Sequence, residues 1–109
     1  MKKLVAELLA STNLGKTMGV HDAIFEVVKQ IPRGSVLSYG DVARLSGTHP
    51  RVVGWALHRN PDPKTIPCHR VVFRDGSLSP AFAFGGANRQ RELLENEGVA
   101  FNGDKVRMR

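Results

Sequence analysis

The chain has 109 residues and a formal net charge of +6. This length allows one domain with a modest core and leaves no room for a second catalytic domain. Hydrophobic residues make up 41% of the chain and charged residues 24%, which is typical of a globular protein and too apolar for a disordered one. We therefore expect a single domain over residues 1–109, in which residues 1–20 form a helical amino-terminal extension.

The cysteine content and the apolar runs exclude several kinds of protein. Cys68 is the only cysteine, which excludes an internal disulfide and any multi-cysteine zinc or iron–sulfur site. A lone cysteine also favours a reducing compartment, so we expect the protein inside the cell. No apolar run approaches the ~18 residues that a membrane helix requires, and no membrane partner is expected.

The positive charge is concentrated in residues 44–74, which carry +5 of the net +6. Arginine and lysine side chains neutralise phosphates, so this basic window favours a nucleic-acid partner. An ordinary solvated surface accounts for the same charge, and charge alone does not decide between the two interpretations.

The first part of the chain has two segments with helical spacing of apolar residues. A short amphipathic helix, rather than a signal peptide, is predicted over residues 2–10. A loop is expected at 12–19, where two glycines and several polar residues occur. A second helix is predicted over about 20–31, and Pro32 and Gly34 then end it.

Two short helices are predicted within residues 39–59. Ser38 and Asp41 form a capping-box pattern at the start of the first helix, and Gly47 is a natural residue to end it. Residues 48–50 give the start signal of the next helix, since proline is tolerated in a first helical turn. Together they form a candidate helix-turn-helix whose second helix lies in the basic window. A plain helical hairpin explains the same pattern.

The second half of the chain alternates turns with short elements. The pattern first predicts a rigid turn at 60–63 and a buried strand at 71–73, followed by a hairpin turn at Asp75-Gly76 that leads into 77–78. An apolar loop is then expected at 79–86 and a helix at about 87–97, which Gly98 closes. The last predicted element is a small hairpin about Asn102-Gly103 within 101–106.

Cys68 lies in the stretch Pro67-Cys68-His69-Arg70-Val71. A lone cysteine is usually a small buried hydrophobe. Here His69 and Arg70 add positive charge beside it, which favours the thiolate, the nucleophilic form of the side chain. Adjacent residues on a strand point to opposite faces, so Cys68 and His69 need a bend or a bridging water to act together.

This stretch and its surroundings resemble the DNA-binding and active-site domain of the O6-alkylguanine-DNA alkyltransferases, also called methylated-DNA–protein-cysteine methyltransferases. The resemblance runs from about His21 to Gly98 and is carried by the motifs PCHRV, SYGDVA, RVVGWALHRNP and LLENEG. It implies a mainly α domain with short β elements, similar to a winged helix-turn-helix, in which residues 21–98 form the core.

The resemblance implies a repair reaction that each molecule performs once. Cys68 takes the alkyl group from O6-alkylguanine in double-stranded DNA and keeps it as a stable thioether. Glu97 orients His69, which deprotonates Cys68 through a water, and Asn60 fixes the turn around the site. No metal and no organic cofactor are implied, and we expect a monomer.

The resemblance also implies that the second helix of the helix-turn-helix enters the minor groove. Arg51 then fills the space left by a flipped guanine, and Tyr39 crowds the 3′ phosphate to promote the flip. Gly54 and Ala56 are small and permit close approach to DNA. The remaining DNA-contact residues that the match implies are Ser38 and Arg59.

Four features depart from the family pattern. Only about 20 residues precede the core, so the family's usual amino-terminal domain is expected to be missing. The stretch 47–51 is shorter than usual, and Trp55 stands where many members have a small residue; core packing is its simplest explanation. The loop at 79–86 lacks the usual hydroxyl beside its glycines, which predicts base recognition by stacking, backbone groups and an apolar wall. The expected substrate-loop residues are Phe82, Phe84, Gly85 and Gly86.

Two further functions fit parts of this pattern. Alkyltransferase-like proteins bind alkylated guanine without accepting the group and recruit other repair factors. They typically carry tryptophan in place of the nucleophile, so the presence of Cys68 favours the enzyme. A helix-turn-helix regulator with a structural cysteine is the other alternative, and it leaves His69, Asn60 and Glu97 unexplained.

Overall fold

The structure is a computed structural model that describes residues 19–80 and 82–108. The helix expected at 2–10 and the loop expected at 12–19, apart from Gly19, lie outside the described residues. In the described part of the chain, no helix combines the length and the apolar character that crossing a membrane requires.

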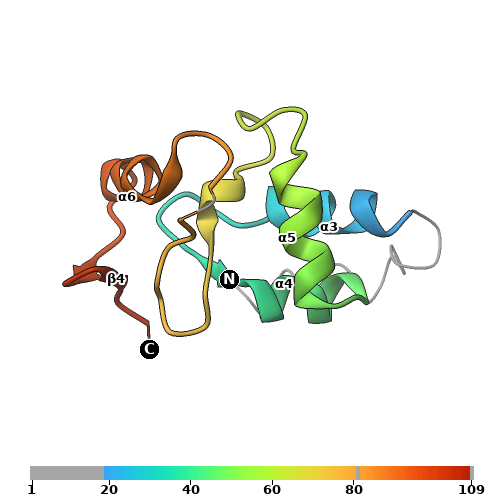
Figure 1. The fold of residues 1–109 in the computed structure, drawn as a ribbon, viewed down its shortest axis with the longest axis horizontal. Coiled ribbons are helices and arrows are strands. Elements are labelled where there is room, and N and C mark those ends of the chain that lie inside the picture. Colours follow the sequence, from blue (N-terminus) through green and yellow to red (C-terminus); the bar gives the residue numbers. More distant parts are fainter. Residues whose placement is uncertain (1–18, 81, 109) are drawn as a thin grey trace.

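Three helices pack against one another at one end of the molecule (Figure 1). They are α3 (Val20–Lys29), α4 (Tyr39–Ser46) and α5 (Pro50–His58). Their apolar stripes meet and exclude water, which is the main force that stabilises this unit. The buried residues that the three helices contribute to the core are Ile24, Val27, Val28, Val42, Ala43, Val53, Ala56 and Leu57.

The helix-turn-helix prediction is confirmed by α4 and α5. The Ser38 hydroxyl accepts a hydrogen bond from the Asp41 amide at 3.0 Å, and the Asp41 carboxylate accepts one from the Ser38 amide, so the capping box is complete. Gly47 ends α4 at φ 76°, a conformation that side chains with a Cβ rarely adopt. His49 then caps α5, because its Nδ1 accepts the Arg51 amide at 3.2 Å.

A two-residue parallel sheet joins the helical unit to the rest of the molecule. It pairs β1 (Leu37–Ser38) with β2 (Val71–Val72), with Leu37 opposite Val71. The strand predicted at 71–73 is therefore present over its first two residues. Its expected hairpin partner at 77–78 is not a strand, although the Phe73 amide donates to the Ser77 carbonyl at 2.9 Å and closes the turn.

The last helix, α6 (Gly86–Asn96), confirms the helix predicted at about 87–97. It lies at the opposite end of the molecule from α3, α4 and α5, with β2 between them (Figure 1). Leu94 of α6 is fully buried and packs with Val72 and Val106 in a second, smaller core.

The chain ends in the hairpin β3 (Phe101–Asn102) and β4 (Lys105–Val106), close to its predicted place. Its two turn residues are Gly103 and Asp104 rather than Asn102 and Gly103, because Asn102 pairs with Lys105. The hairpin packs on Gly76, whose carbonyl accepts the Val106 amide at 2.8 Å. Gly76 has φ 90°, and a Cβ there would collide with the Val106 carbonyl, so this contact requires glycine.

The capping role of Ser38 makes a prediction about stability. Ser38 is buried and its hydroxyl is used within the helix cap, so it does not lie on an open DNA-contact surface as expected. Replacing Ser38 by alanine should lower the free energy of unfolding by about 1 kcal/mol, measured by urea denaturation. Ser35→Ala is the matched control, because the Ser35 hydroxyl makes no hydrogen bond within the described residues. Equal losses for both variants would contradict the capping role.

Candidate active site

Cys68 lies in a tight turn, η1 (Cys68–Arg70), directly before β2. Pro67 has φ −76° and ψ 71°, the geometry of an inverse γ-turn, and the Cys68 amide donates to the Ile66 carbonyl at 2.7 Å. The Arg70 amide then donates to the Pro67 carbonyl at 3.0 Å. Successive side chains of a 3₁₀ turn are about 120° apart, so Cys68 and His69 do not point to opposite faces as they would on a strand.

Asn60 holds the loop that leads to Cys68. Its side chain is buried, and its Nδ2 donates to the Ile66 carbonyl at 2.8 Å. Its Oδ1 accepts the Asp62 amide at 2.9 Å, which closes an Asx turn at the start of the loop. Both ends of the loop between α5 and η1 are thus fixed by one side chain, as its expected role requires.

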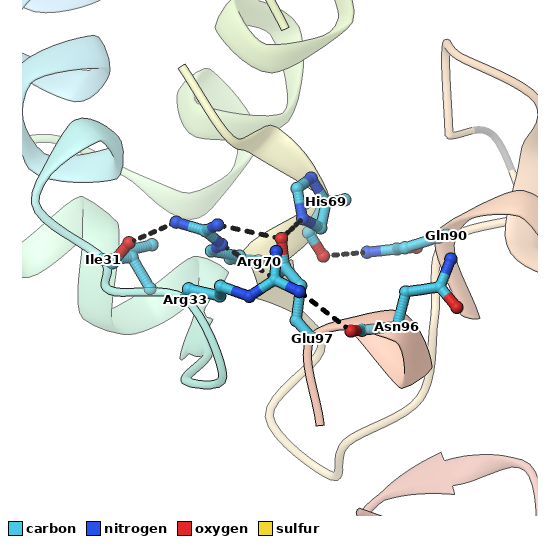
Figure 2. Close-up of polar contacts among 7 residues, drawn as sticks. All are labelled: Ile31, Arg33, His69, Arg70, Gln90, Asn96 and Glu97. Atoms are coloured by element: carbon cyan, nitrogen blue, oxygen red, sulfur yellow. Dashed lines mark hydrogen bonds and ion pairs between the residues drawn. The ribbon is translucent and has the colours of Figure 1, made fainter. Parts of the chain in front are cut away.

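Glu97, the residue that follows α6, binds two consecutive residues of η1 (Figure 2). One of its oxygens, Oε2, lies 2.9 Å from Nε2 of His69 and accepts from Nη2 of Arg70 at 2.8 Å. The other, Oε1, accepts from Nε of Arg70 at 2.9 Å. Arg70 also donates through Nη1 to the Ile31 carbonyl at 2.8 Å, just beyond the end of α3. The network therefore ties α6, η1 and the segment after α3 together.

The protonation states follow from burial and from these contacts. Burial raises the pKa of Glu97, but the hydrogen bonds from Arg70 and His69 outweigh it and hold the pKa at about 2. Burial lowers the pKa of His69 below its usual value, and the contact with Glu97 offsets this only in part. At neutral pH, an ionised Glu97 therefore faces a neutral His69, whose Nε2 carries the proton. Nδ1 is then the ring atom that can accept a proton.

The thiol of Cys68 is protonated in this resting arrangement. Cys68 is 5% exposed, and burial raises its pKa; a hydrogen bond with the Asn60 side chain opposes the shift without cancelling it. The expectation that His69 and Arg70 favour a thiolate is wrong, because His69 is neutral and the Arg70 guanidinium is bound to Glu97. Reaction at Cys68 thus needs a base that removes the proton.

Gln90 is a site residue that the sequence analysis missed. It is 1% exposed, and its Nε2 donates to the carbonyls of His69 and Val71 at 3.1 and 3.0 Å. Its Oε1 accepts the Ser79 amide at 3.2 Å, so Gln90 joins η1 to the loop that begins at Ser79. The available signal was its spacing, because Gln90 lies one turn before the buried Leu94 on the inward stripe of α6.

A pocket of about 550 Å³ opens at Cys68. Tyr39, from the start of α4, is half-buried there, and its ring lies 5.2 Å from that of Phe73. Tyr39 and Phe73 are the residues that directly follow the last β1–β2 pair, Ser38 with Val72. Burial raises the pKa of the Tyr39 hydroxyl, although a hydrogen bond with Ser79 opposes the shift. The residues that line the pocket are Tyr39, Pro50, Arg51, Gly54, Trp55, Leu57, His58, Cys68, Phe73, Ser79, Phe82 and Ala83.

The helix α5 presents some of the expected DNA-contact residues and buries another. Arg51 and Arg59 are exposed, and Gly54 has open space where a Cβ would lie. Ala56 is fully buried in the core, so its expected place on the DNA-facing surface is wrong. The core-packing explanation of Trp55 is also wrong, because this side chain is 60% exposed and lines the pocket. Helical periodicity places residues 53, 56 and 57 inward and turns position 55 outward.

The expected substrate-loop residues do not all lie at the pocket. Phe82 lines it, and Phe84 packs edge-on against Phe82 with ring centres 5.8 Å apart. Gly85 and Gly86 instead form the start of α6 and are not among the lining residues.

Within residues 19–80 and 82–108, no three His, Cys, Asp or Glu side chains are grouped to hold a metal ion.

Comparison with known proteins identifies the family. A family model described as "6-O-methylguanine DNA methyltransferase, DNA binding domain" matches residues 19–99. The chain belongs to this family. The methylated-DNA–protein-cysteine methyltransferase of Methanothermobacter thermautotrophicus is 46% identical over 80 residues, which cover 73% of this chain and 44% of that protein. The protein of the same name from Thermococcus kodakarensis is 47% identical over 73 residues, covering 67% and 40%.

Solved structures of the methyltransferase family share the fold. The O6-methylguanine-DNA methyltransferase of Pyrococcus kodakaraensis has a TM-score of 0.66 at 42% identity, covering 75% of this chain and 47% of that one. S. pombe Atl1, in a complex with damaged DNA containing O6-carboxymethylguanine, has a TM-score of 0.68 at 31% identity, covering 83% and 88%. The match thus spans about half the length of the archaeal methyltransferase relatives, from 40% to 56% of each.

The Glu97 network makes the stability of this methyltransferase-family domain depend on pH. The unfolded chain has the usual glutamate pKa of 4.5 and the folded chain about 2, so the stabilisation is present above pH 4.5 and is lost as the pH falls toward 2. Because the carboxylate is 9% exposed, Glu97→Gln should cost about 3 kcal/mol of unfolding free energy at pH 7 and less at pH 3.

The measurement is urea denaturation of both proteins across this pH range. Glu92→Gln, which removes an exposed carboxylate of α6, should change stability by no more than about 0.5 kcal/mol. If Glu97→Gln loses the same free energy at pH 3 as at pH 7, the charge of Glu97 is not what stabilises the network.

Proposed function

We propose that this chain repairs DNA by moving the alkyl group of O6-alkylguanine to Cys68, once per molecule. The observation that carries the proposal is the position of Cys68: it opens onto the pocket and precedes a histidine held by a buried carboxylate. The contact of Glu97 with His69, made although the two are far apart in sequence, supports the order of nucleophile, base and orienting acid.

The chemistry follows from the protonation states. Nδ1 of His69 takes the proton of the Cys68 thiol through a bridging water, and the ionised Glu97 stabilises the imidazolium that forms. The thiolate attacks the alkyl carbon, so that an S–C bond forms while the C–O6 bond breaks and its electron pair passes to guanine. The proton held by His69 returns to the departing guanine. The thioether has no route back to a thiol, which limits each molecule to one reaction.

The raised pKa of the Cys68 thiol explains why the proposed mechanism needs a base beside it. A cysteine that stays protonated at neutral pH reacts slowly with alkylating agents in solution. Proton removal by His69 produces the thiolate where the substrate carbon is held. This supports a dedicated transfer site rather than a generally reactive thiol.

DNA is the partner that the surface around the pocket fits. A base within a duplex cannot reach a buried thiol, so the damaged guanine must leave the helix and enter the pocket. Arg51 is exposed on the first turn of α5 and lines the pocket, where it can occupy the space that the guanine leaves. Arg70 is bound internally to Glu97 and adds nothing to this surface.

We place the reaction inside the cell, where DNA is found, and assign it to a single monomeric domain with its core at 21–98.

A second candidate function is lesion binding without transfer. The similarity to Atl1 favours it, because Atl1 was crystallised with damaged DNA and the match covers 88% of that chain, whereas it covers 44% and 40% of two archaeal methyltransferases. The buried cysteine beside a His69–Glu97 pair favours transfer, and a direct measurement of the product separates the two.

Intact-mass measurement tests the transfer. Incubation with duplex DNA containing O6-methylguanine should add one methyl group to the protein, on the peptide that contains Cys68. Cys68→Ala and an undamaged duplex are the controls, and neither should give the adduct. An unchanged mass together with tight, lesion-specific binding would establish the second candidate instead.

The role of Arg51 is tested by comparing two substrates. Arg51→Ala should slow transfer from O6-methylguanine in duplex DNA about tenfold or more, because extruding a base costs a few kcal/mol. Transfer from free O6-benzylguanine, which needs no extrusion, should change far less. Lys29→Ala removes the same charge from α3, away from the pocket, and should affect neither substrate. Equal slowing of both substrates by Arg51→Ala would exclude a role in extrusion.

A further inference from the structure

Trp55 is the one tryptophan of the chain, and its exposure is unusual. It is 60% exposed, the highest value among the large hydrophobic side chains of residues 19–80 and 82–108 that lie at the surface. Within the same residues it makes no hydrogen bond and no ring contact. Its indole face and its Nε1–H group are therefore available to a ligand.

Trp55 lies in the lining of the same pocket as Cys68, so a ligand on its indole face would be close to the thiol. Trp55 follows Arg51 by four residues on α5, so the two side chains lie on one face of the helix, and both line the pocket. Gly54 has open space where a Cβ would lie, so no side chain shields the indole on that side. The indole thus stands at the rim of a pocket whose interior reaches the buried thiol.

The other aromatic rings of the pocket already have partners. Tyr39 lies against Phe73, and Phe82 lies against Phe84. Trp55 comes from a third element, α5, and adds an unpaired ring to the same lining. A planar purine entering this space meets aromatic surface from several elements, which is how proteins hold an unstacked base.

The charge of the surroundings favours a nucleotide over an apolar protein segment. No acidic residue occurs in α5, and none is found among the described residues that line the pocket. Exposed arginines lie on either side of Trp55, at Arg51 one turn before it and at Arg59 one turn after it. An aromatic ring between cations suits a base together with its phosphates.

We propose that Trp55 is a specificity-determining residue that forms the outer wall of the Cys68 pocket and stacks on the purine of the extruded O6-alkylguanine. This proposal rests on the proposed function, since it assigns a second contact to the same substrate. It differs from the role of Arg51, because stacking on the purine acts on a free base as well as on a base in DNA. Trp55 binds and positions the purine and takes no part in the proton transfer.

Fluorescence provides a direct test, because Trp55 is the only tryptophan. Titration of the Cys68→Ala protein with free O6-benzylguanine should quench the Trp55 emission, since this variant binds the base without reacting. Emission that stays unchanged at concentrations that saturate alkylation of the wild-type protein would overturn the proposal.

Kinetics provide the second test. Trp55→Ala should raise the half-saturating concentration of free O6-benzylguanine about fivefold or more and leave the limiting rate of alkylation little changed. Trp55→Phe should restore most of the affinity. Val20→Ala, which removes another exposed apolar side chain outside the pocket, is the matched control and should have no effect. Because Trp55 is exposed, the thermal unfolding of Trp55→Ala should match that of the wild type.

Duplex substrates separate contact with the purine from contact with the alkyl group. Trp55→Ala should weaken the reaction of O6-methylguanine and of O6-benzylguanine in DNA by similar factors, because the purine is common to both. A loss confined to the benzyl substrate, a fall in the limiting rate alone or no effect of Trp55→Ala would overturn the proposal while leaving Cys68 transfer intact. Failure of the wild-type protein to accept any alkyl group would instead refute the proposed function.

Discussion

The carboxylate of Glu97 is the group on which the candidate site depends. It binds the side chains of His69 and Arg70, and Arg70 passes the connection on to the Ile31 carbonyl beyond α3. One ionised group thus fixes the imidazole, anchors η1 and joins the two ends of the molecule. The Glu97 carboxylate and the Arg70 guanidinium neutralise each other and form complementary hydrogen bonds, whereas burying either charge without the other would cost free energy of folding. The same contacts that hold the fold together therefore set the tautomer of the base.

Burial shifts the pKa values of Cys68 and His69 in opposite directions. It raises the pKa of the Cys68 thiol and lowers the pKa of His69, so both are neutral in the resting protein. A neutral pair has no permanent charge that an apolar pocket must stabilise. In the mechanism we propose, the proton moves only when a substrate is held in place. Asn60 and Gln90 fix the position of this pair, because they bind backbone carbonyls just before η1 and within it.

The helix α5 serves the core and the substrate surface at the same time. Its inward residues, such as Ala56, pack against α3 and α4, and its outward residues, Arg51 and Trp55, line the pocket. The two sets follow the helical period along nine residues, with positions 53, 56 and 57 inward and positions 51 and 55 outward. His49 caps the start of this helix through the Arg51 amide.

The sequence by itself determined the features that depend on neighbours a few residues apart. The cap at Ser38, the stop at Gly47, the helix start at residues 48–50 and the order of helices follow from local hydrogen bonds and helical spacing. The motif around Cys68 also sufficed to identify the family, because its residues are specific in combination.

Tertiary structure alone decided the rest. The parallel pairing of Leu37 with Val71, the bridge made by Gln90 and the binding of Arg70 to Glu97 join residues that are far apart in the chain. The protonated state of Cys68 likewise depends on which surfaces are buried. Desolvation and long-range contacts arise only when the elements pack, so no local pattern encodes them.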